Sequence, residues 1–205
     1  MAEPGRKLER EFYLRPGLVV APELIGKRLV HRSPEGTTSG IIVEAEAYIG
    51  PEDAAAHSYQ GRRTRRTEAM YGPGGYAYLY TIYGLHLCMN VVTAERDRPE
   101  AVLIRALQPE EGLEQMRARR GRTALRELCS GPGKLTSAMG IGREYYGADL
   151  CGEELYLEVL DRPAPPVAVG RRVNVDYAGV AAEYPWRFVW KDSPFLSVPL
   201  REGIK

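Results

Sequence analysis

Short strand-like segments joined by tight turns are the feature that most limits what this chain can fold into. The segments 76–83 and 85–93 are apolar and β-prone, and Gly84 between them predicts a β-hairpin. Further strands are predicted over the ranges 28–31, 40–48, 101–107, 155–160, 171–175 and 186–190. Because hairpins outnumber strand–helix–strand units, we expect an α+β fold with a mainly antiparallel, curved sheet and a protruding hairpin.

Helices are expected to flank this sheet. One is predicted over residues 17–25, with Gly26 as its stop. A second is predicted over residues 109–120, and a third opens at Gly131-Pro132-Gly133. The proline-rich stretch 163–166 is expected to be a surface loop.

The length of 205 residues suits one domain with a substantial core and is short for two. We expect residues 1–10 to form a flexible N-terminal arm and residues 11–205 a single domain. No apolar run approaches the roughly 18 residues of a membrane span, and the charged N-terminus lacks the apolar core of a signal peptide. These features predict an intracellular protein without a membrane partner, in the cytoplasm or nucleoid if its source is bacterial.

The cysteines and the charges narrow the chemistry. Three cysteines without CxxC or Cys/His spacing predict neither a disulfide framework nor a metal site. The net charge of +1 is low for a nucleic-acid binder, but the arginines are clustered. The two clusters could contact phosphate or form solvated faces, and they comprise Arg62, Arg63, Arg65 and Arg66, then Arg117, Arg119, Arg120, Arg122 and Arg126.

The predicted strand over 40–48 carries carboxylates. Because side chains alternate along a strand, Glu44, Glu46 and Tyr48 share one face. This face is either a solvent-exposed stripe or part of a central strand, where carboxylates are costly unless they are used. Carboxylates two residues apart lie roughly 7 Å from each other and point the same way. One water-activating Glu therefore fits better than the acid and base pair of sugar hydrolases, which flanks the bond from two sides.

The predicted hairpin carries aromatic and polar side chains with open roles. Tyr76, Tyr78 and Tyr80 share a face, which is also what cross-strand packing alone would produce. Tyr83 stands at the tip, where it could wedge between nucleic-acid bases or dock a protein. Asn90, in an otherwise apolar strand, either ties down backbone or reads the edge of a ligand.

Together these residues resemble the alkyladenine (3-methyladenine, or methylpurine) DNA glycosylase family. The order and spacing of the motifs match from about residue 10 to residue 198. The matching segments are 43–48 with 50–53 and His57-Ser58, 78–84 running to Asn90, 102–107 with Pro109, 128–135, 171–173, 177–179, and 186–188 with Ser193-Pro194.

The resemblance implies a role for each matching position. Glu46 corresponds to the general base that activates the attacking water, and Arg105 and the backbone carbonyl of Val173 correspond to groups that hold this water. Tyr48 and Tyr80 correspond to the walls that sandwich the extruded base. The remaining roles are pocket closure by His57, exclusion of normal guanine by Asn90, filling of the gap in the duplex by Tyr83, and possible phosphate contacts by Lys134 and Arg65.

The resemblance also implies the reaction. A monofunctional DNA glycosylase would flip a damaged purine from duplex DNA and hydrolyse its N-glycosidic bond. The expected lesions are 3-methyladenine, 7-methylguanine, hypoxanthine and ethenoadenine. No cofactor or metal is implied, and the enzyme is expected to act as a monomer in base excision repair. No residue is identified as the acid that neutral lesions would need.

Some departures from the family pattern and two alternatives remain. The segment 64–67 and Thr81 differ from mammalian members, Asn174 and Asp176 stand where small or apolar residues are common, and the long basic N-terminal extension is absent. These departures leave the range of lesions open. A non-catalytic nucleic-acid-binding domain would not need Glu46. A hydrolase of free nucleosides or sugars would cleave without a duplex and would not use Tyr83.

Overall fold

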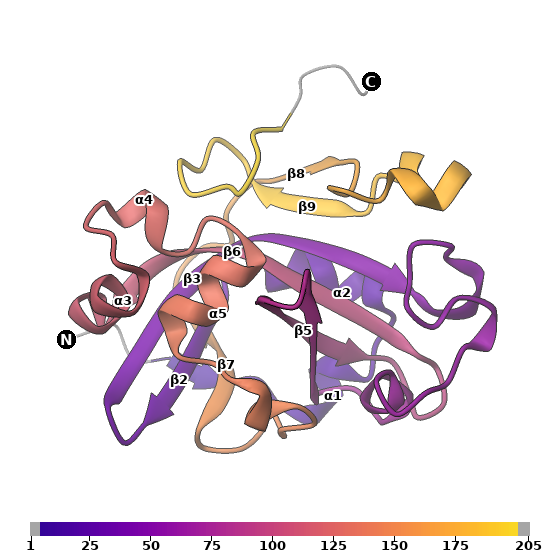
Figure 1. The fold of residues 1–205 in the computed structure, drawn as a ribbon, viewed down its shortest axis with the longest axis horizontal. Coiled ribbons are helices and arrows are strands. Elements are labelled where there is room, and N and C mark those ends of the chain that lie inside the picture. Colours follow the sequence, from indigo (N-terminus) through magenta and orange to yellow (C-terminus); the bar gives the residue numbers. More distant parts are fainter. Residues whose placement is uncertain (1–4, 201–205) are drawn as a thin grey trace.

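One antiparallel sheet contains every strand of the described part of the chain, residues 5–200 of the computed structural model. Its hydrogen-bonded order is β1-β7-β2-β3-β6-β5-β4, and β9 pairs with both β3 and β8. The α+β class predicted from the sequence is confirmed (Figure 1). The strands are β1 (Gly5–Lys7), β2 (Arg28–Ser33), β3 (Gly36–Ile49), β4 (Ala77–Ile82), β5 (His86–Thr93), β6 (Glu100–Glu111), β7 (Leu155–Leu160), β8 (Val167–Gly170) and β9 (Arg187–Trp190).

The long strand β3 is the centre of the sheet. It pairs with β2 and β9 along one edge and with β6 along the other. Irregular register near residues 39–45 bends it, as β-bulges do. Residues 38–47 of β3 are all buried, so the solvent-exposed stripe considered for Glu44 and Glu46 is wrong.

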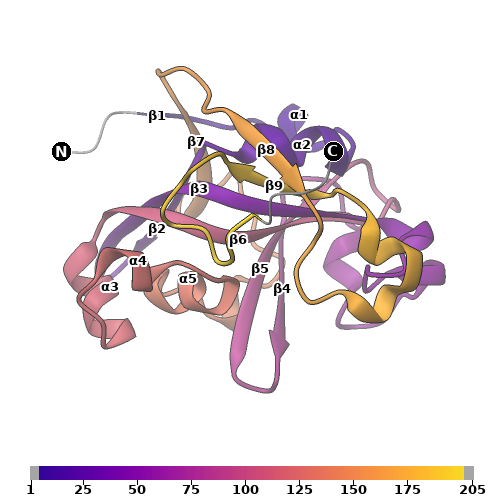
Figure 2. The ribbon, with the colours of Figure 1, turned by 90° about the horizontal axis from the view of Figure 1, so that it is seen from above.

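Helices cover both faces of the sheet. Figure 2 shows α1 and α2 on one side of β3 and β6, and α3, α4 and α5 on the other. None of the helices within residues 5–200 is long and apolar enough to cross a membrane. The α-helices are α1 (Arg10–Tyr13), α2 (Gly17–Leu24), α3 (Leu113–Arg120), α4 (Leu125–Leu128) and α5 (Pro132–Met139). The 3-10 helices are η1 (Gly50–Glu52), η2 (Tyr59–Gly61), η3 (Glu68–Tyr71), η4 (Arg143–Tyr145) and η5 (Asp176–Glu183).

The hairpin of β4 and β5 projects beyond the body of the molecule, as predicted (Figure 2). Its last pair is Ile82 with His86, so three residues form the turn. Tyr83 and Gly84 both adopt positive φ angles, of 50° and 70°. Glycine accepts this conformation without strain, and the tight turn places the Tyr83 side chain in solvent, 86% exposed.

Two predicted element boundaries are wrong. The helix expected from Pro109 begins only at Leu113, because β6 continues to Glu111 through its pairing with β3. Gly112, with a φ of 74°, separates strand from helix. At the N-terminus, where the sequence predicted an arm over residues 1–10 and no strand, residues 5–7 form β1 against β7, and residues 1–4 lie outside the described part.

The strand predicted over residues 171–175 is also wrong. The preceding segment, β8, pairs with β9 instead, and the chain then becomes irregular. Asn174 has a φ of 60°, which an extended strand does not allow. This segment is held by single contacts to β3 and not by a ladder of backbone hydrogen bonds.

A buried ion pair of Arg172 with Asp53 also holds the segment 171–175. The Arg172 guanidinium donates to both oxygens of the Asp53 carboxylate, at 2.5 and 2.8 Å. It also donates to the carbonyls of Ala47 and Ala181, each at 2.9 Å. Both charged side chains are fully buried, so the pair joins the segment after β8 to Asp53, which follows β3 and η1.

We predict that Asp53→Asn destabilises the protein by about 3–5 kcal/mol, because it leaves the Arg172 charge buried without a counter-ion. Urea unfolding monitored by circular dichroism measures the change. As a matched control, Glu68→Gln removes one partner of the exposed Arg63 ion pair and is expected to leave the urea midpoint close to that of the wild type, because water screens an exposed pair. Equal losses in the two variants would contradict the prediction.

Candidate active site

A cavity of about 600 Å³ opens between the hairpin, the end of β3, the start of α5 and the segment 173–177. Its size lies in the ordinary range of small-ligand sites. The cavity brings together most of the predicted site residues, whose side chains come from segments far apart in the sequence. Those that line it are Tyr48, His57, Tyr80, Tyr83, Asn90, Arg105, Lys134 and Val173.

Glu46 lies directly behind the cavity wall and is fully buried. Its carboxylate accepts hydrogen bonds from the Tyr48 hydroxyl at 2.8 Å and from the Val173 amide at 2.7 Å. Arg105 donates to it at 3.3 Å. These three residues line the cavity, so the carboxylate is one layer removed from the space that a ligand would occupy.

Opposing effects act on the pKa of Glu46. Burial raises the pKa, because the carboxylate loses hydration, and this effect is the largest. The positive charge of Arg105 opposes it, followed by the hydrogen bonds from Val173 and Tyr48. The result is a carboxylate with a raised pKa, which makes it a stronger base when it is ionised.

Arg105 is held in turn by Glu44, a residue to which the sequence assigned no role. Its Nε donates to Glu44 at 3.0 Å, while Arg187 donates to the same oxygen at 2.8 Å. The amide and hydroxyl of Ser197 donate to Glu44 at 2.6 and 2.8 Å. The sequence did show that Glu44 shares a strand face with Glu46. It could not show the arginine partners of these residues, because Arg105 and Arg187 lie on other strands.

Aromatic rings form much of the cavity wall. His57 meets the Tyr80 ring edge-on, with centroids 4.5 Å apart, and its Nδ1 lies 2.8 Å from the Tyr78 hydroxyl. The ring centroids of Tyr78 and Tyr80 lie 5.7 Å apart, and both residues are on the same face of β4, as the alternation of side chains predicted. Tyr48 reaches the cavity from β3. The cavity can therefore take a flat, aromatic ligand.

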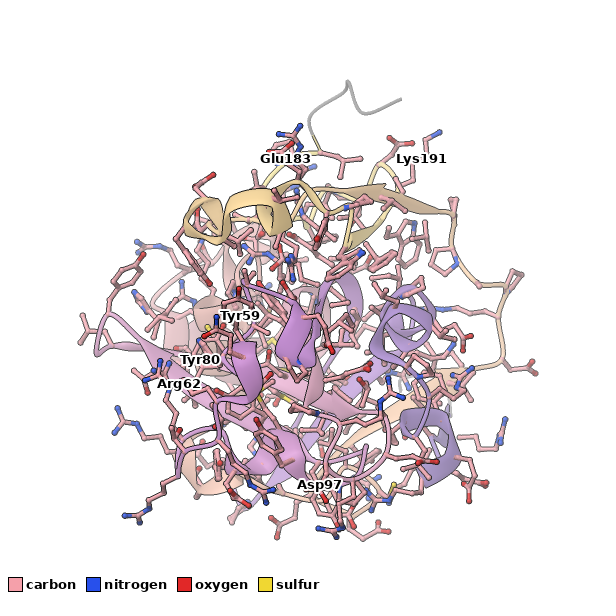
Figure 3. The ribbon with its side chains drawn as sticks, turned by 90° about the vertical axis from the view of Figure 1, so that its right-hand side faces the viewer. Tyr59, Arg62, Tyr80, Asp97, Glu183 and Lys191 are labelled. Atoms are coloured by element: carbon pink, nitrogen blue, oxygen red, sulfur yellow. The ribbon has the colours of Figure 1, made fainter. Side chains whose placement is uncertain are left out.

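The pKa of His57 falls from 6.5 to about 4. Burial is the main cause, and the positive charges of Arg66 and Arg62 add to it. Figure 3 shows the molecule from the side on which the loop carrying Tyr59 and Arg62 lies in front. At neutral pH the His57 ring is consequently uncharged.

Asn90 sits opposite Tyr78 on β5 and donates from its amide nitrogen to the Tyr78 carbonyl at 3.0 Å. Among residues 5–200, its amide oxygen has no hydrogen-bond donor and so remains available at the cavity. The first interpretation drawn from the sequence is confirmed, since the side chain ties down backbone, and contact with the edge of a ligand stays a prediction for a side chain that lines the cavity. No group of three or more His, Cys, Asp or Glu in the same described range could hold a metal ion.

Of the two residues predicted to contact phosphate, one lines the cavity and the other does not. Lys134 is exposed on the first turn of α5 and lines the cavity. Arg65 is exposed but does not line it. Its neighbour Arg66 does, with its guanidinium 5.5 Å from the centre of the Tyr80 ring. Tyr177, from η5, also lines the cavity. Sequence reasoning assigned no role to Tyr177 and considered Arg66 only as a member of an arginine cluster that could contact phosphate.

The comparison with protein families agrees with this geometry. The family model for methylpurine-DNA glycosylase (MPG) matches residues 11–194. The chain belongs to this family. It is therefore a DNA glycosylase, a hydrolase of N-glycosyl bonds that acts in DNA repair, and its substrate is DNA.

Full-length relatives support the assignment. A protein of Clostridium acetobutylicum named "Putative 3-methyladenine DNA glycosylase" is 50% identical over 200 residues, which cover 94% of this chain and 98% of the relative. Proteins of the same name from Alkaliphilus oremlandii and Desulfitobacterium hafniense are 48% and 46% identical. These two alignments cover 93% and 94% of the glycosylase described here, and 98% and 99% of the relatives.

We predict that His57 makes this glycosylase less stable in acid. Above pH 6.5 the residue is neutral in both the folded and the unfolded chain. As the pH falls from 6.5 towards 4, the unfolded chain takes up a proton first, which costs at most roughly 3 kcal/mol of stability. In urea unfolding series, His57→Gln is expected to lose less stability than the wild type over this range. Parallel curves for the two proteins would contradict the prediction.

Proposed function

We propose that this glycosylase rotates a damaged purine out of duplex DNA into the cavity and hydrolyses its N-glycosidic bond with water activated by Glu46. The observation that carries the proposal is a buried carboxylate placed directly behind a cavity with aromatic walls. The lesions are alkylated or deaminated purines: 3-methyladenine, 7-methylguanine, hypoxanthine and ethenoadenine. The product is an abasic site for base excision repair.

The hydrogen bonds of Glu46 support its role as the base. Within residues 5–200, one carboxylate oxygen accepts hydrogen bonds from Tyr48 and Arg105, while the other accepts one only from the Val173 amide. The second oxygen therefore has a free acceptor position. A water bound there, next to the Val173 carbonyl, would attack C1′ and pass a proton to Glu46.

The charge balance of the reaction suits a single carboxylate. As the bond between C1′ and the base breaks, its electron pair leaves with the base and positive charge develops on the sugar. The Glu46 anion stabilises this charge until the water oxygen bonds to C1′. An alkylated, cationic purine leaves as a neutral molecule. A neutral lesion leaves as an anion unless it is protonated. Since the base is a carboxylate and not an amine, we propose a monofunctional enzyme.

Stacking and gap filling offset the cost of flipping. Extruding a base costs a few kcal/mol of stacking and pairing. Stacking on an aromatic ring returns about 1–3 kcal/mol per base, and Tyr48 and Tyr80 offer two rings. Tyr83, exposed at the tip of the projecting hairpin, would fill the gap left in the duplex.

Polar groups around the cavity support recognition of DNA. Asn90 would exclude normal guanine through its exocyclic amine, since a purine in the cavity meets its side chain. Lys134, on the first turn of α5, and Arg65 would contact phosphates, which their exposure supports. Because one chain carries the proposed base, the stacking rings and the gap-filling tyrosine, we propose that the enzyme acts as a monomer.

Glu46→Gln is expected to bind lesion-containing duplexes but to excise the base slower by orders of magnitude, because the amide cannot accept the proton. The test incubates the protein with duplexes that contain one hypoxanthine, ethenoadenine or 3-methyladenine and then cleaves abasic sites with alkali. Glu153→Gln, at an exposed ion pair, is the control and should match the wild type. Wild-type single-turnover rates in Glu46→Gln would disprove the assignment.

Tyr83→Ala is expected to weaken base flipping, because the gap in the duplex would stay empty. The measurement is the fluorescence of ethenoadenine in duplex DNA, which changes when the base enters the aromatic cavity. Tyr59→Ala, an exposed tyrosine outside the hairpin, is the control. A hydrolase of free nucleosides would show no effect of Tyr83→Ala and would also cleave without a duplex.

A further inference from the structure

Each of the two aromatic walls carries an arginine. The Arg172 guanidinium lies 4.7 Å from the centre of the Tyr48 ring. The Arg66 guanidinium lies 5.5 Å from the centre of the Tyr80 ring. A ring that already attracts one cation attracts a second cation less, because the first draws on the same electron density. This arrangement acts against the preference of bare aromatic walls for a positively charged base.

Arg172 and Arg66 differ in whether a neighbouring carboxylate neutralises their charge. Arg172 is fully buried and is neutralised by Asp53. Within residues 5–200, Arg66 has no carboxylate within 4 Å, and it is exposed at the edge of the cavity. Its positive charge also acts on His57 and on the Tyr78 hydroxyl. Arg66 therefore contributes an unneutralised positive charge to the wall that a base would contact.

The backbone of the loop holds Arg66 in place. The Tyr146 hydroxyl donates to the carbonyls of Arg65 and Arg66, each at 3.2 Å, and accepts from the Ala69 amide at 2.9 Å. Arg65 and Arg66 are thus adjacent in the sequence, both exposed, and anchored by the same hydroxyl. Only Arg66 lines the cavity and stacks on Tyr80. Arg65 is a matched control for any effect of charge on DNA binding in general.

We propose that Arg66 is a specificity residue that disfavours cationic purine lesions relative to neutral ones. The proposal rests on the function proposed above. A cationic base on the Tyr80 ring would meet the repulsion of the guanidinium and a weakened ring face, whereas a neutral base would meet neither. Cationic purines are good leaving groups and need little help. Arg66 thus evens out the rates by favouring the neutral lesions, whose bonds are harder to break.

The test compares Arg66→Gln with Arg65→Gln. Single-turnover excision rates are measured on matched duplexes that contain 7-methylguanine, which is cationic, or hypoxanthine, which is neutral. In Arg66→Gln we expect the ratio of the 7-methylguanine rate to the hypoxanthine rate to rise about three- to ten-fold. In Arg65→Gln both rates should change by the same factor and the ratio should stay within about two-fold of wild type. Arg66→Lys keeps the charge and should restore most of the wild-type ratio.

The outcomes separate the two proposals. If the wild type excises neither base, the proposed function fails. If it excises both, but Arg66→Gln leaves the ratio unchanged or matches Arg65→Gln, the role of Arg66 is overturned. Thermal unfolding of each variant reports its folding, and Arg66→Met, which keeps the apolar stem without the charge, should reproduce the shift. A normal ratio in a folded Arg66→Met protein would also overturn the proposal.

Discussion

The active site depends on the way Arg105 joins two buried carboxylates. Glu44 and Glu46 are adjacent on one face of the central strand, where unpaired charges would be prohibitively costly. Arg105 donates to both, and Arg187 adds a second positive charge at Glu44. The network stabilises these charges inside the folded protein. It leaves one oxygen of Glu46 with a single hydrogen bond, from the Val173 amide.

This requirement explains why the site is assembled from distant segments. Arg105 lies opposite β3 on β6, and Arg187 lies opposite it on β9. Ser197 and the Val173 amide approach from irregular segments that single contacts hold to β3. The ion pair of Arg172 with Asp53 holds the segment that carries Val173, so the position of a hydrogen-bond donor to Glu46 depends on a contact outside the cavity.

The electrostatic character of the cavity follows from its neighbours. Burial, with the added charges of Arg66 and Arg62, keeps His57 neutral, and an arginine over each of the Tyr48 and Tyr80 rings weakens the attraction of these rings for a further cation. The hairpin of β4 and β5 projects beyond the body of the molecule (Figure 2), and Tyr83 in its turn is exposed and also lines the cavity. The buried Glu46 carboxylate, the Tyr80 ring and the exposed Tyr83 thus lie on different segments of the chain: β3, β4 and the turn between β4 and β5.

The sequence by itself determined the local features of the site. Alternation placed Glu46 beside Tyr48, Gly84 marked the hairpin, and β7 begins and ends where its pattern predicted. Tertiary structure decided where β6 gives way to α3, why residues 171–175 are irregular, and which arginine reaches Tyr80. Local patterns report periodicity and turn preference, whereas these outcomes depend on strand pairing and on buried charges. Their partners lie tens of residues away, and no local pattern records such distances.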